Sequence, residues 1–488
     1  MNKPIRTMAI FCMALFLALL VNSTYLQYLE ADELNSHNDN KRVRDAEFSR
    51  ERGAILVGGD SVAESVPTKD QFKFQRRYPQ AQKYAHLTGY YSYTYGRNAV
   101  ELTQNDILSG SDPRLFVNRV VDMFGNSQPK GGDVSLTIDP KAQEAAYQGL
   151  RDLGGPDIKG AVVALDPSTG AILANVSSPS YDPNLLASHR LSTLPDVWKR
   201  LSNDPERPML NRGIQEIYPP GSTFKLVTAA AALSSGQYTP DSKVPGGTSL
   251  DLPLTDTNLP NENGMSCGGD KITLTQALQV SCNVAFGWLG MQIGDAALRE
   301  QAQKFGFGDK YLDDLNDQAV SRFPAKLDEP QTALSAIGQF DVAATPLQMA
   351  MVTAGIANGG TVMKPYLVDE VRSPDLEVLD KANPEPYRSA VSSSVARDLT
   401  QMMIEVVDRG TGTTAQIPGI KVAGKTGTAQ SSVDRNPYAW FVSFAPADDP
   451  KVAVAVLVED AGVARDAISG SGLAAPIAKR VMEAVINK

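Results

Sequence analysis

A serine and a lysine three positions apart, Ser222 and Lys225, follow directly after the loop signal Pro219-Pro220-Gly221. The residues beyond them are apolar on nearly every side as far as Leu233, and this pattern predicts a buried helix. Ser222 would lie at the N-cap or in the first turn, where its side chain and that of Lys225 project from one face. A hydroxyl held beside an amine supplies a nucleophile and a potential general base, so the pair indicates nucleophilic catalysis.

The Ser-x-x-Lys pattern is weak when it stands alone. A second match, from Ser127 to Lys130, lies in a Gly/Pro-rich stretch that cannot form a regular helix. Without further support, Ser222 would be interpreted as a capping serine and Lys225 as a solvated lysine. The catalytic interpretation therefore depends on other motifs.

Two such motifs follow in the chain. Ser281 and Asn283 supply a second hydroxyl and a carboxamide, although Ser36-His37-Asn38 matches the same Ser-x-Asn pattern in a polar tail. Taken singly, Ser281 and Asn283 are also explained as caps at the start of a helix.

The third motif, Lys-Thr-Gly, occurs once, on a predicted strand. Lys425 and Gly427 would face one way and Thr426 and Thr428 the other, with Gly427 allowing a ligand backbone to approach closely. An edge-strand charge is the simpler explanation of Lys425 alone. In the order Ser-x-x-Lys, Ser-x-Asn, Lys-Thr-Gly, however, the three motifs form a strong signal.

Composition excludes several other functions. The chain has 488 residues, a net charge of -9 and a pI near 5.1, whereas a nucleic-acid-binding surface would be basic. The three histidines, His37, His86 and His189, lie far from one another and from the cysteines, which argues against a zinc site or a histidine-based triad. We therefore expect no metal and no nucleic-acid partner.

The N-terminus predicts export. Lys3 and Arg6 precede an apolar run from Met8 to Val21, which extends through Leu26 if a short polar break is included. The strict run fits a cleaved signal and the extended run fits a membrane span, and the sequence leaves both open. Either way, the excess of positive charge on the N-terminal side places the remainder outside the cytoplasm.

Two cysteines lie beyond this apolar run, Cys267 and Cys282, and an oxidising compartment favours a bond between them. We predict a Cys267–Cys282 disulfide, with two buried free thiols as the alternative.

The chain divides into three predicted parts. Residues 1–29 form a cytoplasmic tip and signal-anchor, residues 30–132 a small non-catalytic module, and residues 133–488 a catalytic domain. In the last part, strands are expected near 134–139, 161–166, 171–176, 421–429, 439–445 and 452–458, and helices near 140–153, 273–293, 296–305, 346–357 and 474–486. A sheet built from both ends of the domain, with helices carried between, is an α+β arrangement.

The chain resembles the class B penicillin-binding proteins, which are monofunctional D,D-transpeptidases of peptidoglycan, and within them the actinobacterial penicillin-binding protein A group. Besides the three motifs, the resemblance rests on the segments Arg52–Ile55, Leu136–Asp139, Ala336–Gln339, Thr345–Ala350 and Ala439–Pro446. It implies an antiparallel sheet with flanking helices, preceded by a dimerisation or pedestal-like module and a retained anchor.

The resemblance also implies a role for each motif residue. Ser222 would attack the penultimate D-Ala of a stem peptide ending in D-Ala-D-Ala, and Lys225, neutral because of burial and the like charge of Lys425, would take its proton. Ser281 would relay the proton, and Asn283 would bind the peptide backbone. Lys425, Thr426 and Thr428 would hold the terminal carboxylate of the peptide or of a β-lactam. No cofactor is implied.

The resemblance further implies a polytopic glycosyltransferase partner and a role in division and cell shape. A D,D-carboxypeptidase or serine β-lactamase stays open as an alternative, although no acidic residue stands in a context that marks it as a deacylating base. A β-lactam sensor or a non-catalytic scaffold would belong to a different class. The presence of all three motifs argues against a non-catalytic scaffold.

Overall fold

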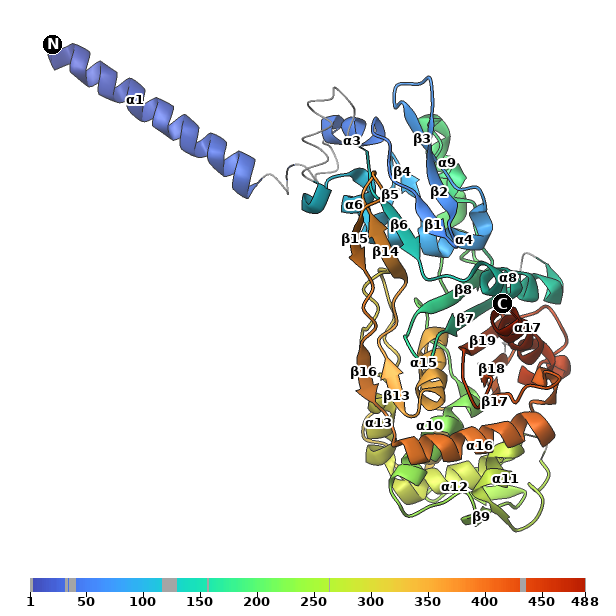
Figure 1. Cartoon of the computed structure of the whole chain (residues 1–488). Coiled ribbons are helices and arrows are strands. Elements are labelled where there is room, and N and C mark those ends of the chain that lie inside the picture. The colour runs from blue at the N-terminus through green and yellow to red at the C-terminus, as the bar shows by residue number, and fades with distance from the viewer. Residues whose placement is uncertain are drawn as a thin grey trace.

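The computed structural model describes residues 3–30, 34, 41–115, 130–155, 158–262, 264–430 and 436–487. Near the N-terminus, helix α1 (Lys3–Thr24) continues as a π-helical turn, Tyr25–Leu29, and none of their side chains is buried. Together they form one helix that is long and apolar enough to cross a membrane. The helix projects away from the rest of the molecule (Figure 1). The decoy residues Ser36 and Ser127 lie outside the described residues.

A six-stranded sheet forms the end of the molecule nearest this helix, in the order β15-β14-β6-β1-β2-β3. Its strands are β1 (Ile55–Val57), β2 (Asp60–Pro67), β3 (Phe74–Arg77), β6 (Asp133–Leu136), β14 (Val368–Arg372) and β15 (Val378–Lys381). β1 and β6 pair in parallel and the other neighbours antiparallel. The sheet therefore joins strands from both sides of the predicted boundary between residues 132 and 133.

Short helices cover this module and enclose a buried ionic cluster. They are α3 (Lys41–Phe48), α4 (Ala81–Thr88), α5 (Ala99–Thr103) and α6 (Asn105–Ser109). Glu101 on α5 is fully buried and accepts a hydrogen bond at 2.6 Å from the guanidinium of Arg52 and another at 2.6 Å from that of Arg76. The Tyr78 hydroxyl donates to the same carboxylate at 3.1 Å.

The second sheet is antiparallel throughout, in the order β17-β18-β19-β7-β8. Its strands are β7 (Lys159–Leu165), β8 (Ile172–Ser178), β17 (Ala423–Ala429), β18 (Tyr438–Ala445) and β19 (Val452–Asp460). Every residue of β18 is buried, as expected for a strand covered on both faces. Alternate residues of β7 enter different cores, with Val162 in one and Val163 in the other.

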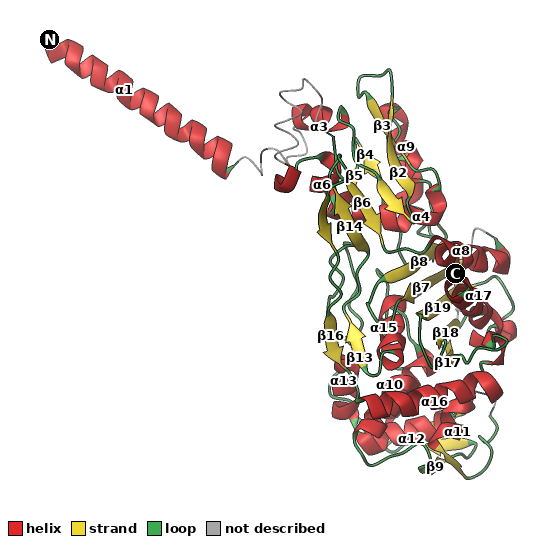
Figure 2. Cartoon of the chain, viewed as in Figure 1, coloured by secondary structure: helices red, strands yellow, loops and turns green. Residues whose placement is uncertain are grey.

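Helices cover both faces of this sheet (Figure 2). α8 (Pro140–Gly154) and α17 (Ala475–Ile486) pack on one face and against each other, and α15 (Pro346–Ala357) and α16 (Ser393–Arg409) pack on the other. Asp139 caps α8 by accepting from the amides of Lys141 and Ala142. The predicted antiparallel sheet with flanking helices is confirmed.

A helical part completes the C-terminal region. Its members are α10 (Lys225–Ser234), α11 (Leu274–Gln279), α12 (Asn283–Ile293), α13 (Asp295–Lys304) and α14 (Glu329–Ala336). The single helix expected over residues 273–293 is wrong, because the chain breaks between α11 and α12, where Ser281 has a φ of +60°. Apolar periodicity runs through the break and hides it. α14 and α16 were not expected.

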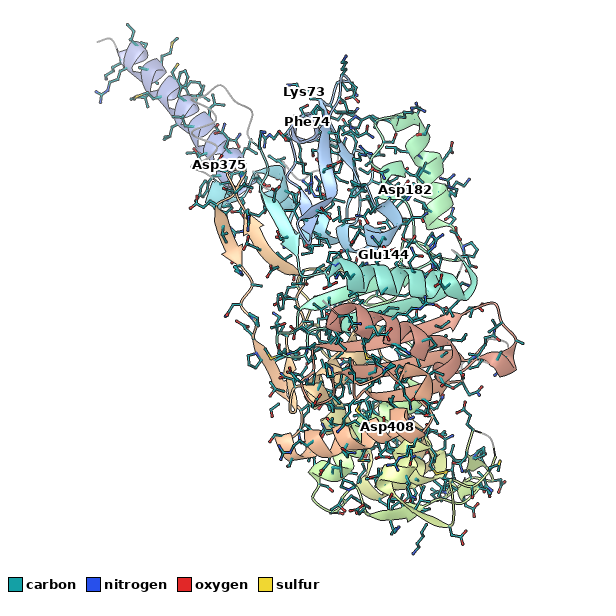
Figure 3. The ribbon with its side chains drawn as sticks, turned by 45° about the vertical axis from the view of Figure 1, so that its right-hand side comes forward. Lys73, Phe74, Glu144, Asp182, Asp375 and Asp408 are labelled. Carbon is teal, nitrogen blue, oxygen red and sulfur yellow. A yellow bond between two sulfur atoms is a disulfide. The ribbon has the colours of Figure 1, made fainter. Side chains whose placement is uncertain are left out.

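The remaining elements are short. They are α9 (Leu194–Ser202), β4 (Tyr91–Ser92), β5 (Gly96–Arg97), β9 (Lys243–Pro245), β10 (Ser249–Asp251), β11 (Asn258–Pro260), β12 (Lys271–Thr273), β13 (Thr361–Met363) and β16 (Pro386–Ser389). Figure 3 shows how these parts follow one another along the molecule. Lys73 and Phe74 lie at the outer end of the first module, Glu144 lies on α8, and Asp408 lies on α16 in the opposite half.

Candidate active site

Ser222 lies on a short 3-10 turn, Gly221–Phe224, that leads directly into α10. Gly221 and Gly338 shape this turn. Both have a positive φ, +54° and +74°, and the Gly221 amide donates to the Gly338 carbonyl at 3.0 Å. A Cβ at Gly338 would lie 2.2 Å from the Gly221 carbonyl oxygen, so the two backbones approach closely because neither residue has a side chain. Ser222 is thus placed before the α-helix, in a tight turn, and not at its N-cap.

The turn packs against β17, and Gly427 makes this contact possible. A Cβ at Gly427 would meet the Thr223 methyl at 3.0 Å and the Pro220 carbonyl at 3.1 Å. The missing side chain of Gly427 therefore makes room for the turn that carries Ser222, and its role toward a ligand stays a prediction. Trp440 on β18 holds the same loop by donating its indole N–H to the Pro219 carbonyl at 3.0 Å.

Lys225 is fully buried as the first residue of α10, and its amine lies among three oxygen atoms. It donates at 2.7 Å to the Ser281 carbonyl and at 2.7 Å to the Asn283 side-chain oxygen, and it lies 3.2 Å from the Ser281 hydroxyl. A neutral amine has two N–H groups and one lone pair. The two short contacts use both N–H groups, which leaves the lone pair free to accept a hydroxyl proton.

The Ser281 hydroxyl stands between the two lysines. Lys425 is also fully buried, and its amine donates to this hydroxyl at 2.9 Å and to the Thr426 carbonyl at 2.9 Å. Ser281 holds this position through its left-handed backbone, which is uncommon for a residue with a side chain. The geometry thus links Lys225, Ser281 and Lys425 in a continuous chain of contacts.

Burial changes the charge state of both amines. Burial lowers the pKa of Lys225 well below its ordinary value, and the positive charge of Lys425 lowers it further, while Glu262 opposes these effects. Burial also lowers the pKa of Lys425 to about 7, again against the opposing effect of Glu262. The site therefore favours a neutral Lys225, the form that can accept a proton.

A cavity of about 430 Å³ opens above Ser222. Ser222, Asn283 and Thr428 line it, so one residue of each motif reaches the same space. Thr426 is buried, and its hydroxyl is paired with that of Thr411 at 2.6 Å. The cavity is also lined by apolar side chains, those of Leu259, Pro260, Leu334, Ile337 and Phe340.

Three site residues carry no motif and were missed. Thr411 supports Thr426, and Glu262 is an acidic residue that lines the cavity. Asn261 accepts at 3.0 Å and 3.2 Å from the amides of Asn283 and Val284 and thereby caps α12 from a remote loop. Their positions depend on contacts between distant segments, so no local spacing marks them.

Cys267 and Cys282, the pair named from the sequence, are joined by a disulfide in the structure. Cys282 lies between Ser281 and Asn283, and the bond ties this turn to the loop that also carries Asn261 and Glu262. The link fixes the second motif against one side of the cavity.

Comparison with known proteins agrees with this geometry. The model of the penicillin binding protein transpeptidase domain matches residues 160–483, and that of the penicillin binding protein A dimerisation domain matches residues 52–134. The chain belongs to the class B penicillin-binding proteins. It is 44% identical to peptidoglycan D,D-transpeptidase PbpA of Mycolicibacterium smegmatis over all of both chains, and 44% identical to PbpA of Mycobacterium tuberculosis over all of this chain and 99% of that one.

Solved structures of class B penicillin-binding proteins share the fold. The ceftriaxone acyl-enzyme complex of penicillin-binding protein A from M. tuberculosis superposes with a TM-score of 0.87 at 44% identity, covering 91% of this chain and 100% of that one. The Pseudomonas aeruginosa PBP2 complex with WCK 5153 has a TM-score of 0.73 at 31% identity, covering 89% and 95%. This chain therefore has the penicillin-binding transpeptidase fold.

Proposed function

We propose that this chain crosslinks peptidoglycan as a D,D-transpeptidase, through an acyl-enzyme on Ser222. The observation that carries the proposal is the lysine–serine–lysine arrangement directly beside a cavity lined by one residue of each motif. The names of the relatives, peptidoglycan D,D-transpeptidases at 44% identity over the full chain, support the same activity. The β-lactam acyl-enzyme complexes of the similar M. tuberculosis protein support acylation by β-lactams.

The first half-reaction forms the acyl-enzyme. The Ser222 oxygen attacks the carbonyl carbon of the penultimate D-Ala, and Lys225 accepts the hydroxyl proton on its free lone pair. The backbone N–H groups of Ser222 and Thr428 stabilise the negative charge that develops on the carbonyl oxygen. In support, the turn of Ser222 lies against the end of β17, where a Cβ at Gly221 would come within 3.1 Å of Ala429 Cα.

Ser281 passes the proton onward. Its hydroxyl contacts both lysine amines, so a proton taken by Lys225 reaches the departing D-Ala nitrogen through it. Asn283 binds the stem-peptide backbone, and Lys425 with Thr426 and Thr428 binds the terminal carboxylate. The second half-reaction transfers the acyl group to the amine of another stem peptide, which closes the crosslink.

The N-terminal helix is proposed to be a retained single-pass anchor, with residues 30–132 and 133–488 outside the cytoplasm. Its 27 apolar-rich residues, Lys3–Leu29, suffice to cross a bilayer with tilt. We further propose a polytopic glycosyltransferase partner and a role in cell division and shape. Both follow from the similarity to the penicillin-binding protein A group.

Covalent labelling of the full-length chain with a fluorescent penicillin tests the nucleophile. Ser222→Ala should lose the label completely, and Ser127→Ala, the matched change in the decoy motif, should keep it. Label retained for hours would agree with a transpeptidase, whereas rapid release from the wild type would indicate a D,D-carboxypeptidase or β-lactamase. A wild-type chain that takes no label would contradict the proposed function.

A further inference from the structure

Glu262 is an acidic side chain in an unusual place. Among the described residues that line the cavity above Ser222, it is the single ionisable one, and its side chain is exposed. It makes no ion pair or hydrogen bond within the described part of the chain. A carboxylate left without a partner beside a nucleophile is available to bind a cation.

The position of Glu262 is fixed by its neighbour. The Asn261 side chain is buried, donates at 2.9 Å to the Gly247 carbonyl and at 2.8 Å to the Met265 carbonyl, and accepts from the two α12 amides. Asn283 in turn donates to the Pro260 carbonyl at 3.2 Å. These bonds hold the Glu262 backbone against the start of α12, next to the second motif.

The charge of the cavity also favours a cation. The two lysines behind Ser222 are buried and reach only hydroxyl and carbonyl or amide oxygens in the contacts described above. Burial lowers the pKa of both amines, whereas Glu262 is the one exposed ionisable side chain among the described residues that line the cavity, so its negative charge faces a bound ligand directly.

We propose that Glu262 forms the acceptor subsite, binding the ammonium group of the second stem peptide beside the acyl-enzyme. This inference rests on the proposed function. The bound ammonium loses one proton to solvent, and the resulting amine nitrogen attacks the acyl carbonyl carbon. The new C–N bond forms, the bond from carbon to the Ser222 oxygen breaks, and the second amine proton returns to that oxygen.

The role of Glu262 can be measured by letting an amine and water compete for the same acyl-enzyme. The full-length chain is acylated with a thioester analogue of acyl-D-Ala-D-Ala, and glycinamide, an ammonium without a carboxylate, competes with water. In Glu262→Gln, we expect the glycinamide concentration that gives half-maximal aminolysis to rise about fivefold, a larger change than any in the hydrolysis of the same acyl-enzyme. Glu262→Asp should keep most of the preference. Glu329→Gln, a matched change of an exposed residue on α14, should have no effect.

Several outcomes would overturn the inference. An unchanged ratio of aminolysis to hydrolysis in Glu262→Gln would show that Glu262 does not bind the acceptor. If the rates of aminolysis and hydrolysis fell equally, Glu262 would instead act as a general base for any nucleophile. Loss of penicillin labelling in Glu262→Gln would show that Glu262 acts on the acylation step, through the two lysines, and not on the acceptor. Salt gives a second measurement on the wild type alone, because added salt should weaken aminolysis more than hydrolysis. A wild type that takes no label would overturn the proposed function itself.

Discussion

Two pairs of buried basic side chains, one in the N-terminal module and one at the active site, lie in opposite electrostatic environments. In the N-terminal module, Arg52 and Arg76 each meet the carboxylate of Glu101 at 2.6 Å. At the active site, Lys225 and Lys425 meet hydroxyl, carbonyl and amide oxygens. Both pairs are almost or completely buried.

The difference decides which groups keep their charge. Burial raises the pKa of the Glu101 carboxyl, but the charges of Arg76 and Arg52 outweigh this effect and hold its pKa below the ordinary value. In the part of the chain that the structure describes, no carboxylate pairs with Lys225 or Lys425, and burial lowers the pKa of both. The same physical environment thus gives a structural ion cluster where a carboxylate is supplied, and a proton acceptor where it is withheld.

The largest expected effect comes from removing the proton acceptor. Lys225→Met keeps the length and apolar stem of the side chain but has no lone pair for the Ser222 proton. We expect the rate of acylation by penicillin to fall about 10²- to 10⁴-fold. Thermal unfolding should occur at an unchanged or higher temperature, because a buried amine is removed. Stopped-flow labelling and calorimetry measure the two results, and a normal acylation rate would contradict the role of Lys225.

Breaking the ion cluster should affect stability and leave chemistry intact. Glu101→Gln removes the carboxylate that Arg76 and Arg52 share and leaves Arg52 with only the more distant Glu47, at 3.6 Å, so we expect it to lower the free energy of unfolding by about 3–5 kcal/mol. Folded protein should still be acylated at the normal rate. The control is Glu144→Gln, which removes a partly exposed pair with Lys83 and should cost less than about 1 kcal/mol. Equal losses in the two variants would refute the distinction.

Within the described residues, the active-site lysines form no ion pair, and a disulfide bond fixes the second motif. The Cys267–Cys282 bond closes a loop of 15 residues, and replacing both cysteines by serine should lower the free energy of unfolding by about 3 kcal/mol. Acylation should slow, since Ser281 and Asn283 flank Cys282. Unchanged mass after alkylation without reductant would agree with the bond, and two modified thiols would disprove it.

The smallest expected effect is a pH dependence of stability. Burial lowers the pKa of Lys425 to about 7 in the folded chain, from an ordinary value of 10.5 that it regains on unfolding. Between these values the unfolded chain binds the extra proton, so the free energy of unfolding rises with pH. From about pH 7 to pH 9, we expect urea denaturation to show a rise about 1–2 kcal/mol larger in the wild type than in Lys425→Met. Parallel curves would mean that Lys425 stays charged.

The order of the motifs and their local sequence patterns predicted most of the residues that the structure brings together at the candidate site. Three short motifs gave Ser222, Lys225, Ser281, Asn283 and Lys425, because each depends on neighbours within a few positions. Short apolar runs indicated β7, β8, β18 and β19, because a strand covered on both faces is apolar at successive positions. The break before α12 was not predicted, because its left-handed serine interrupts no hydrophobic pattern.

The sequence by itself determined which groups are available: a serine, a lysine, a second serine, an amide and a second lysine in that order, after an apolar N-terminal segment. Only the tertiary structure decided their states and distances. Burial of both lysines among distant segments lowers the pKa of their amines, and the missing side chain of Gly427 allows the Ser222 turn to pack against β17. Glu262 enters the cavity because Asn261 is bonded to residues 22 and 23 positions further along the chain. Such contacts follow from folding the whole domain, so no local window of sequence contains them.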